Sequence, residues 1–136
     1  MELNLAIIIW RLLNLPDADT GRIVTGGLDM LPRFNMAIAL ARHLKAPHEA
    51  TAALVAARKA IQDGLDVQRN RAVHGIQYLE EDGKYTIETH RGKGAGVTTE
   101  ASPEHFEQVA SDIMRVRRTL QRGFREAGLD WLPHRP

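Results

Sequence analysis

Apolar residues recur along most of this chain at the three- and four-residue spacing of amphipathic helices. The first run, residues 2–14, is apolar nearly all round, which predicts a helix buried on more than one side. In a chain this small, a second copy often covers the other side, so this helix is expected to line a homodimer contact. The run is far shorter than the ~20 residues of a membrane span, and it contains Arg11. Glu2 stands where a signal peptide has a basic residue.

Three further helices are predicted before the middle of the chain. Asp17 caps a short second helix that ends at Gly26. Pro32 opens a third helix that reaches Leu44. The fourth and longest covers 47–74 and contains Gly64, which costs about 1 kcal/mol relative to alanine inside a helix. The expected buried positions are Phe34, Ile38, Ala41 and Leu44 in the third helix and Ala50, Leu54, Ala57, Ile61, Leu65 and Ala72 in the fourth.

Between about residues 76 and 100 the helical pattern gives way to alternation. Alternating residues on both sides of Asp82-Gly83 predict a two-stranded β-hairpin. The glycine-rich basic stretch 91–96 lacks the spacing of a phosphate-binding fingerprint and is interpreted as a loop. The predicted fold class is therefore all-α, an up-and-down bundle of about four to five helices with this hairpin inserted between the last two. One domain is expected over 1–136.

Ser102 and Pro103 are the cap and first-turn residues of a last helix that ends near Ala127, with Gly128 as its stop. One stripe of this helix is apolar: Phe106, Val109, Ile113, Val116, Leu120 and Phe124. A second stripe, nearly opposite, holds Arg115, Arg118, Arg122 and Arg125. Such a row can follow a nucleic-acid backbone, but it is more often a solvated face. The nearby acids Asp112 and Glu126 favour the second interpretation, and both stay open.

Composition is that of an ordinary globular protein, with 43% apolar and 26% charged residues among 136. The net charge of +1 gives no overall field toward nucleic acid, so any basic surface must be local. The absence of cysteine excludes disulfides, thiolate nucleophiles and cysteine-ligated metals, and it suits the cytoplasm. The six histidines show no metal-ligand spacing, so neither a metal nor a cofactor is expected.

The segment 66–75, at the end of the long helix, combines Arg69, Asn70, Arg71 and His74. Arginine binds phosphate through a planar fork of donors, and histidine exchanges protons near neutral pH. Together they are the minimum needed to cleave a phosphodiester without a metal. An exposed helix end is the alternative interpretation, because arginine and histidine commonly complement the helix dipole there.

The run Arg69–Gly75 resembles the signature of the HEPN superfamily, in which a polar residue follows an arginine and a histidine comes a few positions later. The predicted helices and small β insertion resemble compact bacterial members. The resemblance implies metal-independent RNA cleavage at a site shared by two subunits. Carried over, His74 is the general acid or base, Arg69 holds the scissile phosphate, and Asn70 orients groups in the site. Arg71 and the arginines of the last helix are then expected to bind RNA.

Two other functions stay open, because some HEPN domains have lost catalysis. One is a non-catalytic helical dimer, a binding module or the partner of a nucleotidyltransferase or an antitoxin. The other is nucleotide binding in a dimer groove by Arg69 and the arginine row, without cleavage. Whether the chain is an enzyme is therefore undecided at the level of sequence.

Overall fold

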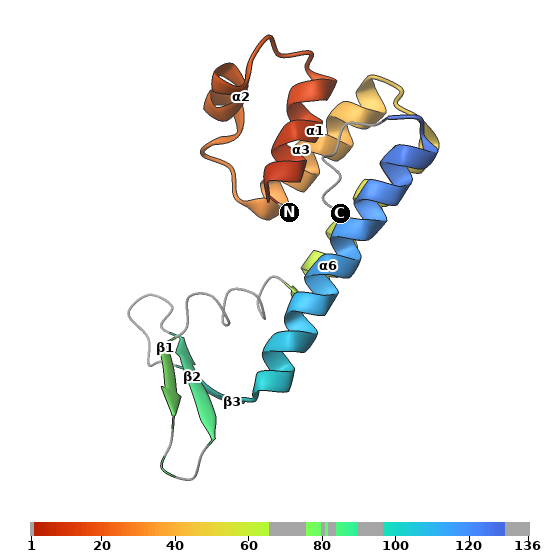
Figure 1. The fold of residues 1–136 in the computed structure, drawn as a ribbon. Coiled ribbons are helices and arrows are strands. Elements are labelled where there is room, and N and C mark those ends of the chain that lie inside the picture. The colour runs from red at the N-terminus through yellow and green to blue at the C-terminus, as the bar shows by residue number, and fades with distance from the viewer. Residues whose placement is uncertain (1, 66–75, 80, 82–83, 90–96, 130–136) are drawn as a thin grey trace. The chain divides into compact units, whose positions relative to one another are not determined.

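The structure is a computed structural model that describes residues 2–65, 76–79, 81, 84–89 and 97–129. This part of the chain is mainly helical (Figure 1). Its elements are the helices α1 (Glu2–Leu12), α2 (Ala18–Thr25), α3 (Met30–His43), α4 (His48–Ala60) and α6 (Pro103–Glu126), the π-helical turn η1 (Ile61–Leu65), and the strands β1 (Ile76–Leu79), β2 (Tyr85–Thr89) and β3 (Val97–Ala101). The chain forms two compact units, Met1–Gln62 with Arg115–Pro136 and Asp63–Met114.

In the first unit, α1 packs against α2 and α3, and α3 packs against α4. Leu5, Ile8 and Ile9 of α1 are completely buried, which confirms that the first helix is a core element. The expected core positions of α3 and α4 are also buried (Phe34, Ile38, Ala41, Ala50, Leu54, Ala57 and Ile61). The prediction for Leu44 is wrong, because its side chain is 49% exposed just after the end of α3.

The ends of these helices follow local chemistry. The carboxylate of Asp17 accepts a 2.7 Å hydrogen bond from the Thr20 backbone N–H, which confirms the predicted cap of α2. Helix α1 ends at Leu12, two residues before the predicted end, because Asn14 adopts a left-handed conformation with φ 51°. Asparagine tolerates this conformation better than most residues and is a known alternative to glycine at helix ends.

Helices α1 and α2 meet through one close contact. The indole N–H of Trp10 donates a 3.1 Å hydrogen bond to the Thr25 hydroxyl, which in turn donates to the Gly21 carbonyl oxygen at 2.9 Å. A Cβ atom on Gly21 would overlap the indole ring. The missing side chain of Gly21 therefore lets the tryptophan lie directly on α2.

The long fourth helix is shorter than predicted. Regular α-helix ends at Ala60 and is followed by η1, in which Gly64 has φ 118°, a non-helical value. Glycine adopts this conformation without steric cost, whereas it is a weak helix former. The prediction of unbroken helix over 47–74 is therefore wrong at Gly64. Its remaining residues, 66–74, lie outside the described part of the chain.

In the second unit the described strands form one antiparallel sheet in the order β1-β2-β3. Gln77 lies opposite Ile87 in the β1–β2 ladder, and Ile87 lies opposite Thr99 in the β2–β3 ladder. The prediction of a hairpin with two strands missed β3. Three successive β-branched residues, Val97, Thr98 and Thr99, favour a strand, and they occupy the second edge of β2. Asp82-Gly83 and residues 91–96 lie outside the described residues.

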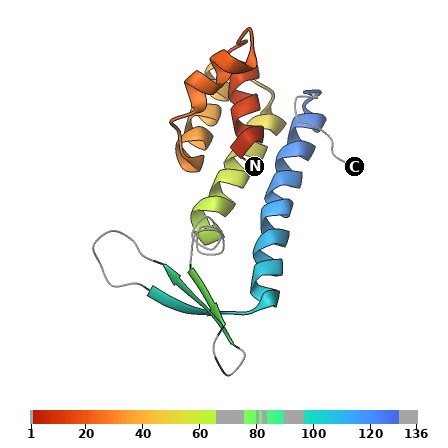
Figure 2. The ribbon, with the colours of Figure 1, turned by 60° about the vertical axis from the view of Figure 1, so that its left-hand side comes forward.

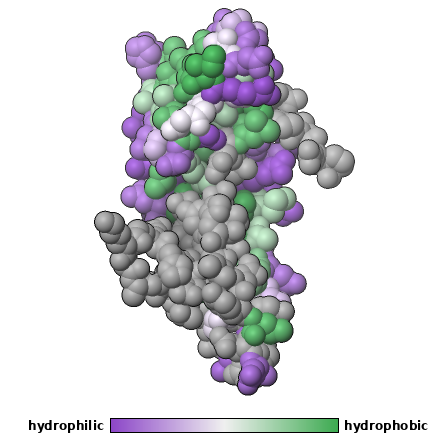
Figure 3. Space-filling model, turned by 90° about the vertical axis from the view of Figure 1, so that its left-hand side faces the viewer, coloured by the Kyte–Doolittle hydropathy of each residue, from purple (hydrophilic) through white to green (hydrophobic). Residues whose placement is uncertain are grey.

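The surface of the first unit carries several apolar side chains. Those most exposed are Leu3, Leu13, Ile23, Leu44 and Val55, and Ile23 of α2 is 84% exposed. On the face shown in Figure 3, apolar atoms lie among polar ones. Scattered apolar residues of this kind are usual on protein surfaces.

Candidate nucleic-acid interface

Helix α6 has well-defined ends, and both were predicted. The Ser102 hydroxyl accepts a 3.2 Å hydrogen bond from the His105 backbone N–H, and Pro103 is the first helical residue. A hydrogen bond from Ser102 lowers the pKa of the Glu104 carboxyl below its usual value. At the other end, Gly128 has φ 73° and Leu129 N–H donates to the Phe124 carbonyl oxygen at 2.8 Å. This is the glycine-terminated pattern expected at a helix C-terminus.

One face of α6 is fixed in the core of the first unit. Val116, Leu120 and Phe124 are buried, as the apolar stripe predicted. Helix α6 runs antiparallel to α4 (Figure 2), and Gly123 lies directly against α4. A Cβ atom on Gly123 would overlap the Cβ of Ala53 and lie 3.0 Å from the carbonyl oxygen of Glu49. Gly123 and the buried residues of α6 therefore mark its inner side, and the arginines lie on the other side.

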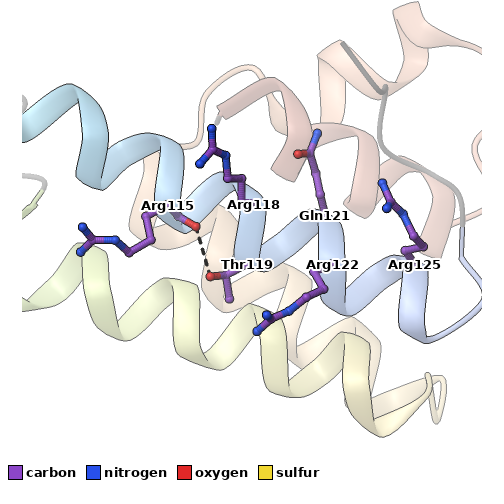
Figure 4. A pocket seen from close by; sticks show the side chains of 6 residues that line it. All are labelled: Arg115, Arg118, Thr119, Gln121, Arg122 and Arg125. Carbon is purple, nitrogen blue, oxygen red and sulfur yellow. Dashed lines mark hydrogen bonds between the residues drawn. The ribbon is translucent and has the colours of Figure 1, made fainter. Parts of the chain in front are cut away.

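The outward side holds the predicted arginine row. Arg115, Arg118, Arg122 and Arg125, here called the α6 arginine face, line a hollow of about 490 Å³ together with Thr119 and Gln121. In Figure 4, Arg118, Gln121 and Arg125 extend to one side of the helix. Arg115 and Arg122 extend to the other. The sequence analysis missed Thr119 and Gln121, although their positions between the arginines on the same helix place them on this side.

Two arginines of the α6 arginine face, Arg118 and Arg122, have at most a weak ion pair within the described residues. Glu126 reaches Arg122 at 3.8 Å, but both side chains are largely exposed, and such pairs contribute little. Arg118 has no hydrogen bond or ion pair within the described residues. Asp112, the other acidic residue near the arginine row, accepts a 3.0 Å hydrogen bond from Gln108. At the ~1.5 Å rise per residue of an α-helix, Arg125 lies about 15 Å along the helix from Arg115.

This arrangement suits an extended polyanion. Guanidinium groups make paired, charge-assisted hydrogen bonds to phosphate oxygens. Four of them along one helix match a chain of phosphates better than they match one compact anion. The hydroxyl of Thr119 donates to the Arg115 carbonyl oxygen at 3.1 Å, so it offers a ligand only its acceptor capacity. Gln121 adds an amide beside Arg118 and Arg125.

The predicted catalytic residues Arg69, Asn70 and His74 lie outside the described residues, as does Arg71. Their roles therefore stay predictions. The structure does change one premise, because Gly64 interrupts the helix that was expected to carry them.

We compared the chain with protein-family models, with curated proteins and with solved structures, and no significant match was found in any of the three comparisons.

The described residues contain no group of three or more His, Asp or Glu side chains placed to share a metal ion. None of their helices combines the length and the apolar character that crossing a membrane requires.

Proposed function

We propose that this chain is a metal-independent endoribonuclease of the HEPN type, which binds single-stranded RNA through the α6 arginine face. The proposal of RNA binding rests on the row of four arginines around one hollow. The proposal of RNA cleavage is supported by the sequence Arg69-Asn70-Arg71-Ala72-Val73-His74. The proposed architecture is an up-and-down helical bundle, and the proposed location is the cytoplasm.

In the proposed reaction the ribose 2′-oxygen attacks the neighbouring phosphorus and the bond to the 5′-oxygen breaks. His74 of one protomer takes the proton of the 2′-hydroxyl, and His74 of the second protomer protonates the leaving 5′-oxygen. Arg69 stabilises the charge that develops on the phosphorane oxygens, and Asn70 orients the reacting groups. The products are a 2′,3′-cyclic phosphate end and a 5′-hydroxyl end.

The homodimer that this reaction needs is part of the proposal. The apolar character of α1 supports it, because this helix presents the apolar side chain of Leu3, which is 62% exposed, beside its buried residues. An antitoxin or a nucleotidyltransferase is the proposed partner class if the activity is regulated.

RNA binding is tested with a labelled single-stranded oligoribonucleotide by fluorescence anisotropy over a range of salt concentrations. The double variant Arg118→Gln/Arg122→Gln removes two charges from the α6 arginine face. Each lost phosphate contact is expected to flatten the slope of log K against log salt by about 0.7. The control Arg11→Gln/Arg42→Gln makes the same charge change at exposed arginines of α1 and α3 and should leave the slope unchanged. Equal slopes in both double variants would contradict binding at this face.

Cleavage is tested separately with Arg69→Ala/His74→Ala. The wild type should cut RNA in the presence of a chelator and leave cyclic phosphate ends, whereas the double variant should still bind RNA through the α6 arginine face and leave it intact. Cutting at an unchanged rate by the double variant excludes the catalytic assignment. Binding without any cutting by the wild type favours the second candidate, a non-catalytic RNA- or nucleotide-binding module. That candidate is favoured by the α6 arginine face itself, which needs no catalytic residue to bind phosphate.

A further inference from the structure

The hollow on α6 is lined mainly by groups that bind phosphate. Four of its six lining residues are the arginines of the α6 arginine face, and the other two are Thr119 and Gln121. None of these six residues is aromatic. Proteins that recognise the bases of a single strand stack them on flat side chains, mainly aromatic rings, or bind their edges with polar groups. The six residues of this hollow offer no aromatic ring for stacking.

The two uncharged residues of the hollow have little capacity left for the edge of a base. The Thr119 hydroxyl donates its proton to the Arg115 carbonyl oxygen at 3.1 Å, so it can only accept. Gln121 is half-buried and already interacts with another residue. A glutamine that selects adenine uses its amide donor and acceptor together. The guanidinium groups therefore provide most of the binding, and phosphate is the group that they suit best.

The four arginines alternate along the two sides of the hollow. In Figure 4, Arg118 and Arg125 extend to one side of α6, whereas Arg115 and Arg122 extend to the other. Steps of three, four and three residues separate them along the sequence. At the standard rise these steps are about 4.5, 6 and 4.5 Å along the helix axis. A strand that lies along the hollow therefore meets a guanidinium group from alternate sides at each step.

This spacing sets the length of strand that the face can hold. A stacked strand advances about 3.4 Å per phosphate along its axis, and an unstacked strand advances further. The distance of about 15 Å from Arg115 to Arg125 thus corresponds to about four or five phosphates. In a duplex the same number of base pairs makes almost half of a turn of about 10 base pairs, so either strand leaves a straight row of side chains. A single strand fits the row better than a duplex.

We propose that the α6 arginine face recognises only the phosphates of a single strand, so that it binds single-stranded DNA as tightly as RNA. This lack of selectivity rests on the proposed binding of RNA at the face and is independent of RNA cleavage. DNA lacks the 2′-hydroxyl, which is the nucleophile of the proposed cleavage and the group by which proteins distinguish RNA. Single-stranded DNA is therefore bound, left uncut, and competes with RNA for the face.

The first experiment measures how unlabelled strands displace a labelled oligo(U), by fluorescence anisotropy at low salt. The competitors have equal numbers of phosphates: oligo(U), oligo(dT), a mixed DNA strand that contains guanine, and a DNA strand that is abasic at every position. Their dissociation constants should agree within about fivefold, which is about 1 kcal/mol and the least that a good base contact contributes. A larger difference, including a preference for guanine, overturns the proposal. Tighter binding of a duplex than of its separate strands also overturns it.

The second experiment assigns the binding to the face with Arg118→Gln/Arg122→Gln. These two arginines are exposed and have, within the described residues, at most the 3.8 Å pair between Arg122 and Glu126. The variant should weaken the RNA, the DNA and the abasic strand by the same factor. The control Arg11→Gln/Arg42→Gln should bind all three as the wild type does. Circular dichroism checks that both double variants are folded.

Strand length tests the number of phosphates that the face holds. The slope of log K against log salt is measured for the wild type and for Arg118→Gln/Arg122→Gln with strands of increasing length. Two lost contacts should separate the slopes by about 1.4. This difference should be complete at about five phosphates and stay constant in longer strands. A difference that keeps growing with length overturns the proposed footprint.

The outcomes separate this inference from the proposed function. If the substitutions in the face weaken RNA binding but leave DNA binding unchanged, the face selects RNA, and only the lack of selectivity is overturned. If they weaken neither, binding at the face fails for both nucleic acids. RNA cleavage is not measured in these experiments. A wild type that binds both strands equally and cuts neither therefore confirms the inference while it contradicts the nuclease.

Discussion

The inner and outer sides of α6 differ in how much change they tolerate. On the inner side Gly123 touches α4 so closely that a single added carbon would overlap Ala53. On the outer side four exposed arginines surround an open hollow. The packing of α6 on α4 therefore depends on the small size of Gly123, whereas the candidate site depends on the positive charges of the four arginines.

The largest expected effect comes from Gly123→Ala. The added Cβ overlaps Ala53 and crowds the Glu49 carbonyl, so α6 must move away from α4. Overpacking of this kind should lower the free energy of unfolding by about 3 kcal/mol, as measured by urea denaturation. The double variant Gly123→Ala/Ala53→Gly should recover part of the loss. A Gly123→Ala protein as stable as the wild type would show that the two helices do not depend on this contact.

Gly21→Ala should have the next largest effect. Its Cβ overlaps the Trp10 indole, but a side chain can move more easily than a helix backbone. Alanine also favours the helix, so the net loss of unfolding free energy should be about 1–2 kcal/mol. The tryptophan emission should shift to longer wavelength as the indole leaves α2. The matched control is Ala18→Gly, at an exposed position of the same helix, which should destabilise without moving the emission.

Substitutions on the outer side of α6 should change RNA binding and leave stability almost unchanged. Arg118→Gln/Arg122→Gln should change the free energy of unfolding by no more than about 0.5 kcal/mol, because surface substitutions rarely do more. The same variant is the one expected to reduce the salt dependence of RNA binding. A large loss of stability here would contradict the separation between a structural and a binding side of α6.

The smallest expected effect is a pH effect at the start of α6. The hydrogen bond from Ser102 lowers the pKa of Glu104 in the folded state. A carboxyl with a lowered folded pKa stabilises the fold above its unfolded pKa, and this contribution is lost as the pH falls through the folded pKa. Ser102→Ala should raise the pKa of Glu104 toward its ordinary value, measured by NMR titration. Asp17, held by Thr20, should be unaffected and serves as the internal control.

Local signals in the sequence predicted several elements well. Asp17, Ser102, Pro103 and Gly128 marked helix ends that the structure has. The apolar stripe of the last helix predicted the burial of Val116, Leu120 and Phe124, and thereby the outward position of the arginine row. These predictions were correct because helix caps, terminating glycines and the spacing of apolar residues all depend on residues that are close together in the sequence.

The errors arose where two weak local preferences competed. Gly64 was treated as a tolerable residue inside a helix, whereas the chain uses its freedom at positive φ to leave the helix. Strand β3 was missed because the β-branched residues Val97, Thr98 and Thr99 follow the glycine-rich stretch 91–96 without alternating with polar positions, and the strand is stabilised by its pairing with β2. The catalytic prediction for Arg69, Asn70 and His74 stays a prediction.

By itself, the sequence determined the helical class, most helix ends and the order of arginines along α6, since these depend on spacing and on neighbouring residues. Only the tertiary structure decided that Gly21 lies under Trp10 and Gly123 against Ala53, because such contacts join segments far apart in the chain. It alone also showed that the Nε atoms of Arg58 and Arg117 are buried and have no acceptor in the described part of the chain. Pairing and burial are properties of the assembled core, and no spacing along one helix encodes them.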